Sequence, residues 1–417
     1  MHVLRRDRDF RRFWAGHTVS VMGADITYIA LPLVATLLLD AGAAGVATVA
    51  TATFLPSILL PLLAGHLLEG RRRRGVMIAA DLVRAAALAA VPLAYAFDVL
   101  SIPLLATVAF TMGAAGTVFD IGAFAYVPTL VDEDDLPQAN QAMQGSTTAA
   151  QVTGPGLAGL LVQLLGPAVA LTADAVSYLG SALGIASAKR PEPAPVRAAA
   201  KAGLFSGLGV VLRNPFLRLM TAHAALYNAG AQILMVNLVV LAVSDRGLSP
   251  GWYGVALSGT GAGAFLGTML ALRLAARLGY GRAFATALAF STGAPLMLAL
   301  IPWSGGAFGL ALGGLQLAAG AGLGAANVLS VTLRQVVMPK GALARSNGGY
   351  RLITFGVLPI GAALGGVLGE TIGSRWGVGA GTVLMAVSAL PMVLGRIRRL
   401  RTPQDARPTE VAVAVAA

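Results

Sequence analysis

Long apolar runs, separated by short polar segments, follow one another along the chain. A helix needs about 20 apolar residues to cross a bilayer, and twelve of the runs approach or exceed that length. They cover residues 13–39, 46–68, 76–97, 102–130, 140–165, 167–188, 217–243, 251–275, 283–302, 307–336, 348–372 and 378–394. The pattern therefore predicts an all-α membrane protein with twelve transmembrane helices.

One long polar connection divides this pattern nearly in half. Residues 189–214 (KRPEPAPVRAAAKAGLFSGLGVVLRN) are rich in proline, alanine and basic residues and end in an amphipathic stretch. We therefore expect a six-helix half at 1–188, a cytoplasmic linker with an amphipathic helix at 189–214, and a second six-helix half at 215–396. Residues 397–417 are expected to form a disordered cytoplasmic tail.

The two halves share residues at a nearly constant separation. With an offset of 207 positions, Leu136, Asn140, Gly154, Leu157, Gly159 and Gly166 match Leu343, Asn347, Gly361, Leu364, Gly366 and Gly373. With an offset of 206, Phe10, Arg12 and His17 match Phe216, Arg218 and His223. Ordered together, these identities indicate a six-helix unit duplicated in parallel.

Composition and charge support the membrane interpretation. Hydrophobic residues make up 56% of the 417 residues and charged residues only 12%, whereas soluble domains carry about 25% charge. The net charge is +12, and the basic residues gather on alternate loops, as the positive-inside rule predicts for an even number of helices with both termini in the cytoplasm. We therefore expect a multi-pass protein of the cell membrane whose basic residues face anionic lipid headgroups, not nucleic acid.

Other kinds of chemistry find no support in the sequence. The chain has no cysteine, which excludes disulfides and thiolate metal sites. It has no Walker motif, zinc-ligand spacing or nucleophile elbow, and the glycine-rich run at 259–263 lies within a predicted span and follows no strand. We therefore expect neither an enzyme nor a cofactor or metal site.

Three stretches carry a resemblance to a known family. They are FRRFWAGHTVSVMGADITYIALP at 10–32, ADLVRA at 80–85 and FDIGAFAYVPTLVDEDDLPQAN at 119–140. With them the chain resembles the major facilitator superfamily over residues 9–396, and within it the drug and siderophore exporters related to the enterobactin and macrolide efflux proteins. The resemblance implies alternating access around a central cavity lined by the first, fourth, seventh and tenth spans.

A glycine–proline motif lies in the middle of the span at 140–165. Its residues Gly154, Pro155, Gly156 and Gly159 resemble the antiporter motif Gly-Pro-x-x-Gly-Gly of these exporters, with Ala158 at one glycine. In the exporters this motif seals and hinges the interface between the two halves. The alternative is a bent helix that packs closely on its neighbours and has no role in transport.

A second motif lies at 65–74, between the second and third spans. The superfamily pattern is Gly-x-x-x-Asp-Arg-x-Gly-Arg-Arg; here Glu69 replaces the aspartate and Gly70 the first arginine. A carboxylate and an arginine at a helix end can lock a gate through charge-assisted hydrogen bonds. We assign a cytoplasmic gate to Gly65, Glu69, Arg73, Asp81, Arg84 and Asp120.

Two features of this region leave alternatives open. Asp81 and Arg84 have the i,i+3 spacing of an ion pair, and Asp120 is expected to reach Arg84 or Arg73. We interpret the three as a structural or gating charge cluster, and a substrate site is the alternative. The arginines at 71–74 can equally serve topology alone. The acidic loop at 132–135 either pairs with the arginine loops or is solvated.

Asp25 is the acidic residue that we place nearest the membrane midplane. It lies about twelve residues into its span, roughly 18 Å along the helix, and has no basic residue within one turn. A carboxyl group without a charged partner in a low-dielectric region can bind and release a proton, and its ionised form attracts a cation. We expect Asp25, with Tyr28 on the same polar stripe, to handle protons or substrate. The alternatives are a hydrogen bond to a neighbouring helix and an ion pair with a distant arginine. Asp174 is expected to pack.

Further candidates come from the spans that the resemblance places around the cavity. Asn228, Gln232, Gln316 and Asn327 are candidate substrate contacts, and hydrogen bonding between helices is the alternative. The sequence thus predicts a monomeric antiporter that exports amphipathic organic molecules, such as drugs and macrolide-like compounds, in exchange for protons. A dedicated exporter of a siderophore or secondary metabolite is the alternative. A non-transporting sensor or scaffold is disfavoured because the tails are too short for an output domain.

Overall fold

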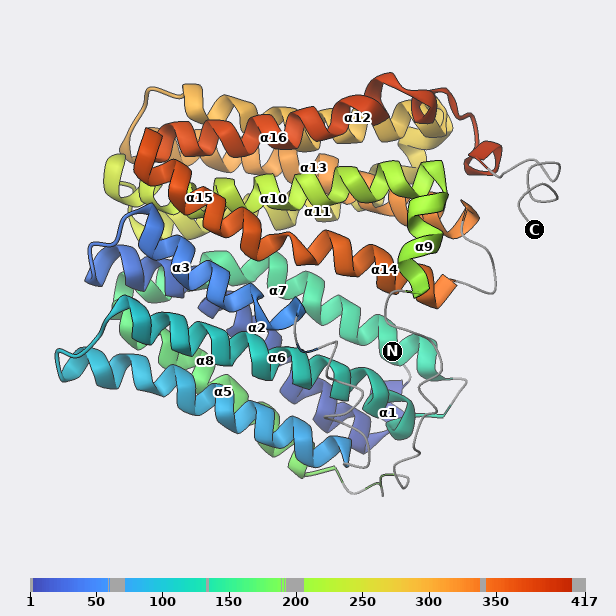
Figure 1. Ribbon diagram of the computed structural model, residues 1–417. Helices are drawn as coiled ribbons and strands as arrows, with labels where there is room; N and C mark the ends of the chain where they lie inside the picture. The colour runs from blue at the N-terminus through green and yellow to red at the C-terminus, as the bar shows by residue number, and fades with distance from the viewer. Residues whose placement is uncertain are drawn as a thin grey trace.

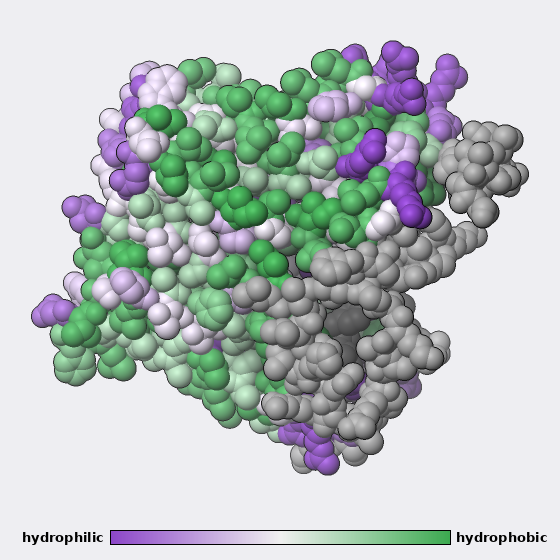
Figure 2. Space-filling view, in the orientation of Figure 1, coloured by the Kyte–Doolittle hydropathy of each residue, from purple (hydrophilic) through white to green (hydrophobic). Residues whose placement is uncertain are grey.

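The computed structural model describes residues 3–58, 60, 72–132, 135–188, 190, 192, 206–337 and 343–406. Within these ranges the chain is helical and forms no strand, as the sequence predicts. Eleven of the described helices are long and apolar enough to cross a membrane, and a shorter apolar helix covers Ala43–Ile58. Figure 2 shows hydrophobic side chains over the middle of the bundle and hydrophilic ones at its two ends.

The first half of the chain forms one bundle of helices (Figure 1). We call residues 3–192 the N-terminal half. Its helices are α1 (Val3–Arg6), α2 (Arg8–Leu38), α3 (Ala43–Phe54), α5 (Arg73–Ala96), α6 (Ile102–Leu130), α7 (Leu136–Leu165) and α8 (Pro167–Ala186). The end of the bundle at which α2 begins carries the arginines that flank α2, α5 and α8, and we call it the basic end.

The second half forms a similar bundle beside the first. We call residues 206–406 the C-terminal half. It contains α9 (Ser206–Arg213), α10 (Pro215–Val239), the π-helical η2 (Val240–Asp245), α11 (Pro250–Leu278), α12 (Tyr280–Gly293), the 3-10 helix η3 (Ala294–Leu300), α13 (Gly305–Val337), α14 (Leu343–Gly356), α15 (Leu358–Ile372), α16 (Ser374–Leu394) and the 3-10 helices η5 (Arg396–Arg399) and η6 (Pro403–Ala406).

The internal repeat is visible in how the helices pack. In the N-terminal half α2 contacts α8 and α7, and in the C-terminal half α10 contacts α16 and α15. Gly23 on α2 lies against Asp174 of α8, and Gly230, its match at an offset of 207, lies against Gly381 of α16. Small residues at these positions let the helix backbones approach closely.

Polar caps fix where two equivalent helices begin. The Asp7 carboxylate accepts a hydrogen bond from the Phe10 amide at 2.8 Å, before α2. The Asn214 side chain accepts from the Phe216 and Leu217 amides, at 3.0 and 3.1 Å, before α10. Both caps satisfy amides that a first helical turn leaves unpaired.

Contacts between the halves lie away from the basic end. The most extensive are those of α3 with α15 and of α7 with α11, and α2 and α3 also contact α10. On α7 they involve residues 151–163, the part that leads to the opposite end. A β-carbon added at Gly159 would lie 2.9 Å from the Gly254 Cα of α11. The α7–α11 contact therefore depends on residues without side chains.

The structure corrects the expected disordered tail in part. Residues 396–406 form two short helices, η5 and η6, and Ile397, Leu400 and Ala406 are buried in the core of the C-terminal half. Asp405 accepts hydrogen bonds from the Thr402 amide and hydroxyl and from the Arg401 amide, which lower the pKa of its carboxyl. Apolar burial and this capped turn hold the segment. Residues 407–417 lie outside the described part of the chain.

Two other expectations fall partly or wholly outside the described residues. The predicted span at 46–68 is described as helix only up to residue 58, with residue 60. Gly65 and Glu69, assigned to the gate, are not among the described residues, and neither is most of the linker at 189–214. Helix α9 occupies the amphipathic stretch predicted at the end of that linker.

Candidate functional site

The N-terminal half contains a cavity of about 290 Å³ that carries most of the predicted chemistry. We call it the main cavity. It is lined by residues of α2, α3, α5, α6 and α8, among them His17, Asp25, Tyr28, Arg84, Phe119, Asp120 and Tyr178. The structure thus brings Asp25, Tyr28, Arg84 and Asp120, predicted from separate stretches of sequence, to one place.

Asp25 lies between the main cavity and the glycine–proline motif. A β-carbon added at Gly154 of α7 would lie 2.5 Å from the Asp25 Cβ and 3.3 Å from its Oδ2. That oxygen is buried and has no hydrogen-bond partner within the described residues. A buried polar atom without a partner is costly, so this carboxyl group is the feature of the cavity that most calls for a functional explanation.

Arg84 is held in place by an acid and two aromatic rings. Its guanidinium donates to Asp81, so the ion pair predicted from the i,i+3 spacing is present. The guanidinium carbon lies 4.6 Å from the centre of the Phe119 ring and 4.2 Å from that of Tyr178, within the range of cation–π contacts. The charge of Arg84 is therefore paired and both faces of its guanidinium are covered, while its buried Nε has no hydrogen-bond partner within the described residues.

Asp120 and Arg73 are not brought together. Asp120 is exposed to the main cavity, and the basic groups that interact with it electrostatically are Arg84 and Arg351 of α14. Arg73 contacts Glu192 instead, which accepts from the Arg73 amide at 2.7 Å and lies 3.9 Å from its guanidinium. Glu192 thereby caps the start of α5, a role that the sequence did not indicate.

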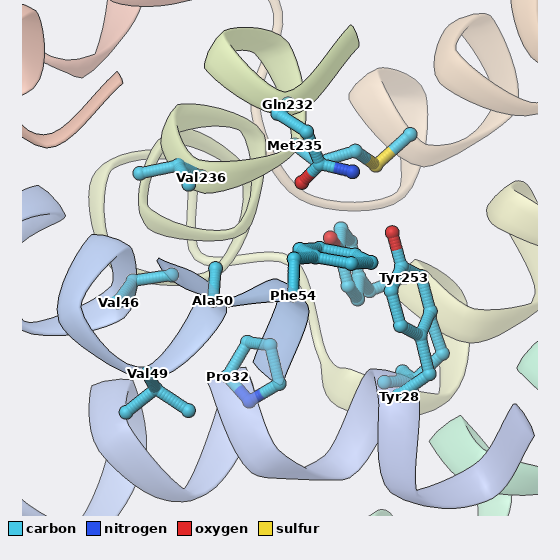
Figure 3. A pocket seen from close by; sticks show the side chains of 11 residues that line it. Tyr28, Pro32, Val46, Val49, Ala50, Phe54, Gln232, Met235, Val236 and Tyr253 are labelled. Carbon is cyan, nitrogen blue, oxygen red and sulfur yellow. The ribbon is translucent and has the colours of Figure 1, made fainter. Parts of the chain in front are cut away.

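A second cavity, of about 50 Å³, lies between the two halves. Figure 3 shows Pro32 and Phe54 of the N-terminal half facing Gln232 and Met235 of α10, with Tyr253 of α11 beside them. We call it the interface cavity. Tyr28 lines both cavities, so the two adjoin.

The other predicted substrate contacts border neither cavity. The Asn228 amide donates to the Thr354 carbonyl of α14 at 2.7 Å and so joins two helices of the same half. Gln316 is 3% exposed, and its Nε2 lacks a partner among the residues described. Asn327 is exposed on α13. Gln232 is thus the one of these four residues that reaches a described cavity.

The remaining motif residues lie on the interface between the halves. A β-carbon added at Gly254 of α11 would contact the Pro155 carbonyl, and one added at Gly156 would lie 3.0 Å from the Ser258 hydroxyl. Gly254 and Ser258 were not predicted as contact residues, although their i,i+4 spacing of small residues is the signal of a close helix contact.

Two side chains connect the halves in an equivalent way near the end of the bundle that lies opposite the basic end, which we call the opposite end. Gln163 of α7 accepts a hydrogen bond from the Gly251 amide at the start of α11, at 3.0 Å. Glu370 of α15 accepts one from the Ala44 amide at the start of α3, at 3.1 Å. Gln163 and Glu370 are 207 positions apart in the sequence, and so are Ala44 and Gly251. We call these two bonds the interdomain caps; neither was predicted from the sequence.

His17 is a further residue of the main cavity, and no role was predicted for it from the sequence. Its ring stacks between those of Phe13 and Phe119, with centroid distances of 5.9 and 6.0 Å. Its Nδ1 is buried and unpartnered in the described structure. His17 lies two helical turns from Asp25 on the same face of α2, a spacing that could have indicated it.

Acidic and basic residues pair at the basic end of the N-terminal half. Asp132 lies 3.6 Å from Arg6 and 3.3 Å from Arg190, and Asp135 lies 3.3 Å from Arg6. Arg190 also reaches Asp7 at 3.4 Å. The described part of the acidic loop therefore pairs with arginines, the first of the two alternatives that the sequence left open.

Asp174 takes the packing role expected of it. It is buried on α8 and accepts hydrogen bonds from Thr27 of α2 and from Ser177, the latter at 2.8 Å. Because Thr27 is on the neighbouring helix, this carboxyl group joins α8 to α2.

Two repeated helical bundles, with a polar cavity in the first and a smaller cavity between the two, are typical of a transporter of the major facilitator type. The chain belongs to the transmembrane secretion effector family of that superfamily, which it matches over residues 4–415. Transport across a membrane, without enzymatic activity, is the function that this membership establishes.

Similar proteins support the same class. Over 371 residues, 86% of each chain, the sequence is 28% identical to an uncharacterised MFS-type transporter, y4rN, of Sinorhizobium fredii. Over 210 residues, 47% of this chain and 50% of the other, it is 29% identical to the multidrug efflux pump Tap of Mycolicibacterium fortuitum. The resemblance to enterobactin and macrolide exporters is not borne out at the level of the subfamily.

Solved structures show the same fold. A bacterial homologue of the iron transporter ferroportin in its inward-facing state superposes with a TM-score of 0.76 at 17% identity, covering 93% of this chain and 98% of that one. The outward-facing state of such a homologue gives a TM-score of 0.57 at 16% identity over 93% and 99%. Identities this low indicate the fold alone.

Proposed function

We propose that the protein is a proton-coupled exporter of amphipathic organic molecules that works by alternating access. The observation that carries the proposal is the unpartnered carboxyl oxygen of Asp25, placed between the main cavity and Gly154 of the glycine–proline motif. A proton-coupled exporter needs an ionisable group that both substrate and conformation can influence. Asp25 lines the main cavity and also lies against α7, which packs on α11 across the interface between the halves.

The arrangement of the halves supports an inward-facing state. The described contacts between α7 and α11 lie toward the opposite end, and the interdomain caps lie there too. The higher TM-score with the inward-facing ferroportin homologue agrees with this arrangement. We assign the basic end to the cytoplasm by the positive-inside rule; the cavity would then receive its cargo from the cytoplasm.

Charge favours neutral or cationic cargo. Asp25 and Asp120 line the main cavity, whereas its arginine, Arg84, is paired with Asp81 and covered by two rings. Aromatic residues of the two cavities, including Tyr28, Phe119 and Tyr253, offer flat apolar surface for an organic molecule. The partial similarity to a multidrug efflux pump points the same way.

Transport into everted membrane vesicles tests the proposal. We expect a panel of cationic dyes and macrolides to include compounds that accumulate when a pH gradient is present and fail to accumulate when it is collapsed. Asp25→Asn should abolish this gradient-driven uptake, because an amide cannot exchange a proton. Binding of the same compounds to purified Asp25→Asn protein should remain measurable.

Asp98→Asn is the matched control. It makes the same chemical change at an exposed turn that lines neither cavity, where the backbone φ of +54° suits asparagine. Gradient-driven uptake should be unchanged. Uptake that persists in Asp25→Asn removes Asp25 from coupling, and the absence of uptake for every compound favours a dedicated exporter of one metabolite.

A further inference from the structure

A groove at the basic end of the C-terminal half is surrounded by arginines. It has a volume of about 780 Å³ and lies where α11 ends, α12 begins and the chain leaves α16. The five arginines that line it are Arg277, Arg282, Arg398, Arg399 and Arg401. We call it the arginine groove.

The fold holds one wall of this groove in place. The Tyr280 and Gly281 amides, at the start of α12, donate to the Arg401 and Leu400 carbonyls at 3.2 and 2.8 Å. Gly281 has no side chain, which lets the backbone of Ile397 and Arg398 pass directly over it. Because Ile397 and Leu400 are buried, the backbone of the arginines between and beside them is held next to Arg277 and Arg282, which line the same groove.

The charges of the groove lack the compensation found elsewhere at the basic end. In the N-terminal half, Arg6, Arg73 and Arg190 each lie within 4 Å of a carboxylate. The groove arginines make no ion pair of this kind with any described residue. Asp405 interacts with Arg401 electrostatically, but its oxygens already accept hydrogen bonds from the turn at 401–402. Arginines gathered without acids repel one another unless an anion joins them.

Apolar side chains at the margin of the groove indicate what kind of anion fits. Leu278 and Leu394 line it and are 42% and 68% exposed, at the ends of two apolar spans. In Figure 2 hydrophilic side chains at the end of α12 and α16 adjoin the hydrophobic surface of the bundle. A ligand here would meet guanidinium groups and a hydrocarbon surface together.

We propose that the arginine groove binds the phosphate headgroup of an anionic phospholipid, with its acyl chains along Leu278 and Leu394. Guanidinium groups pair with phosphate through two parallel hydrogen bonds, and each basic group near a membrane surface adds to the attraction of anionic lipid. The site is separate from the two cavities, and the proposal does not depend on the cargo or on proton coupling.

Native mass spectrometry of the purified full-length protein tests this assignment. The protein is titrated with phosphatidylglycerol, with phosphatidylcholine and with inorganic phosphate. We expect saturable retention of phosphatidylglycerol, weaker retention of phosphatidylcholine, and little competition from inorganic phosphate. In the triple variant Arg282→Gln, Arg398→Gln, Arg399→Gln, the apparent affinity for phosphatidylglycerol should fall by about tenfold or more.

A control variant separates the groove from general surface charge. Arg5→Gln, Arg8→Gln, Arg273→Gln removes three exposed arginines outside the groove and has the same net charge as the triple variant. It should keep the affinity of the unmodified protein. The single variant Arg399→Gln, which changes one exposed side chain, should weaken retention in the same direction if the triple variant folds poorly.

Three results would overturn the proposal. Equal losses in the groove and control variants would show that total charge, not the groove, holds the lipid. Equal retention of phosphatidylcholine and phosphatidylglycerol by the unmodified protein would remove the role of headgroup charge. Displacement of phosphatidylglycerol by inorganic phosphate at similar concentration would make the groove a site for a free anion, not for a lipid.

Discussion

The carboxylate of Glu370 accepts a hydrogen bond from the backbone amide of Ala44 at 3.1 Å, and so joins α15 of the C-terminal half to α3 of the N-terminal half. Ala44 lies in the first turn of α3, where amides point out of the helix unpaired. Gln163 and Gly251 repeat the contact with the roles of the halves exchanged. The first turn of α3 is therefore capped by a side chain of the C-terminal half, and the first turn of α11 by a side chain of the N-terminal half.

Removal of both interdomain caps is expected to favour opening of the opposite end. A lost helix cap costs about 1 kcal/mol, so Glu370→Ala with Gln163→Ala should shift the ratio of open to closed molecules by about 30-fold. Because the chain has no cysteine, Val46→Cys provides a single reporter. Val46 lines the interface cavity and is 1% exposed. Its labelling by a membrane-impermeant maleimide, added at the opposite face, should accelerate accordingly.

Thr371→Ala is the control for that experiment. Thr371 is the neighbour of Glu370, and its hydroxyl bonds to the Val367 carbonyl of its own helix at 2.8 Å. Its removal should leave the labelling rate unchanged. A rate that is equally unchanged in the double-cap variant would mean that these bonds do not hold the opposite end closed.

Gly154→Ala is expected to damage transport through contact with Asp25. The added methyl group would lie 2.5 Å from the Asp25 Cβ, so either the carboxyl group or α7 must move, at a cost of about 1–3 kcal/mol. Thermal unfolding in detergent and gradient-driven uptake should both decline. Gly145→Ala, on the same helix but with open space around it, should instead gain about 0.5–1 kcal/mol. Equal behaviour of the two variants would argue against the contact.

The sequence predicts the spans well because the apolar residues that form a membrane-spanning helix are contiguous in the chain. Residues 102–130 are helical as predicted, and 167–188 differs from α8 by two residues at its end. Local departures from regular α-helix were not predicted. The end of the seventh span is a π-helix, η2, and the ninth span ends in the 3-10 helix η3, which an apolar pattern does not distinguish from regular helix.

The site was predictable only where its residues lie close in sequence. The Asp81–Arg84 pair follows from its spacing on one helix. The contacts of Arg84 with Phe119 and Tyr178, and the cap of Gly251 by Gln163, depend on how far each helix is rotated and shifted against another. Those quantities come from packing of small residues across helices, which a single sequence does not specify.

Loss of the Arg84 guanidinium should leave a buried acid without its partner. Breaking one side of a buried ion pair costs about 3–5 kcal/mol, so Arg84→Gln should lower thermal stability sharply. In the double variant with Asp81→Asn, part of this loss should be recovered, because no uncompensated charge remains. Arg273→Gln, at an exposed and unpaired position of the described structure, should stay within about 0.5 kcal/mol. A strictly additive double variant would mean that the two side chains do not stabilise one another.

Gln232 and Asn228 should separate a cavity residue from a packing residue. Gln232 borders the interface cavity, so Gln232→Leu should change which compounds are transported while the unfolding temperature stays close to that of the unmodified protein. Asn228→Leu removes the bond to the Thr354 carbonyl and leaves that acceptor unpaired, at a cost of about 1–3 kcal/mol. It should therefore lower the unfolding temperature while the folded fraction keeps its substrate profile. The reverse pattern, with selectivity altered by Asn228→Leu and stability by Gln232→Leu, would place the substrate on the α14 side of α10.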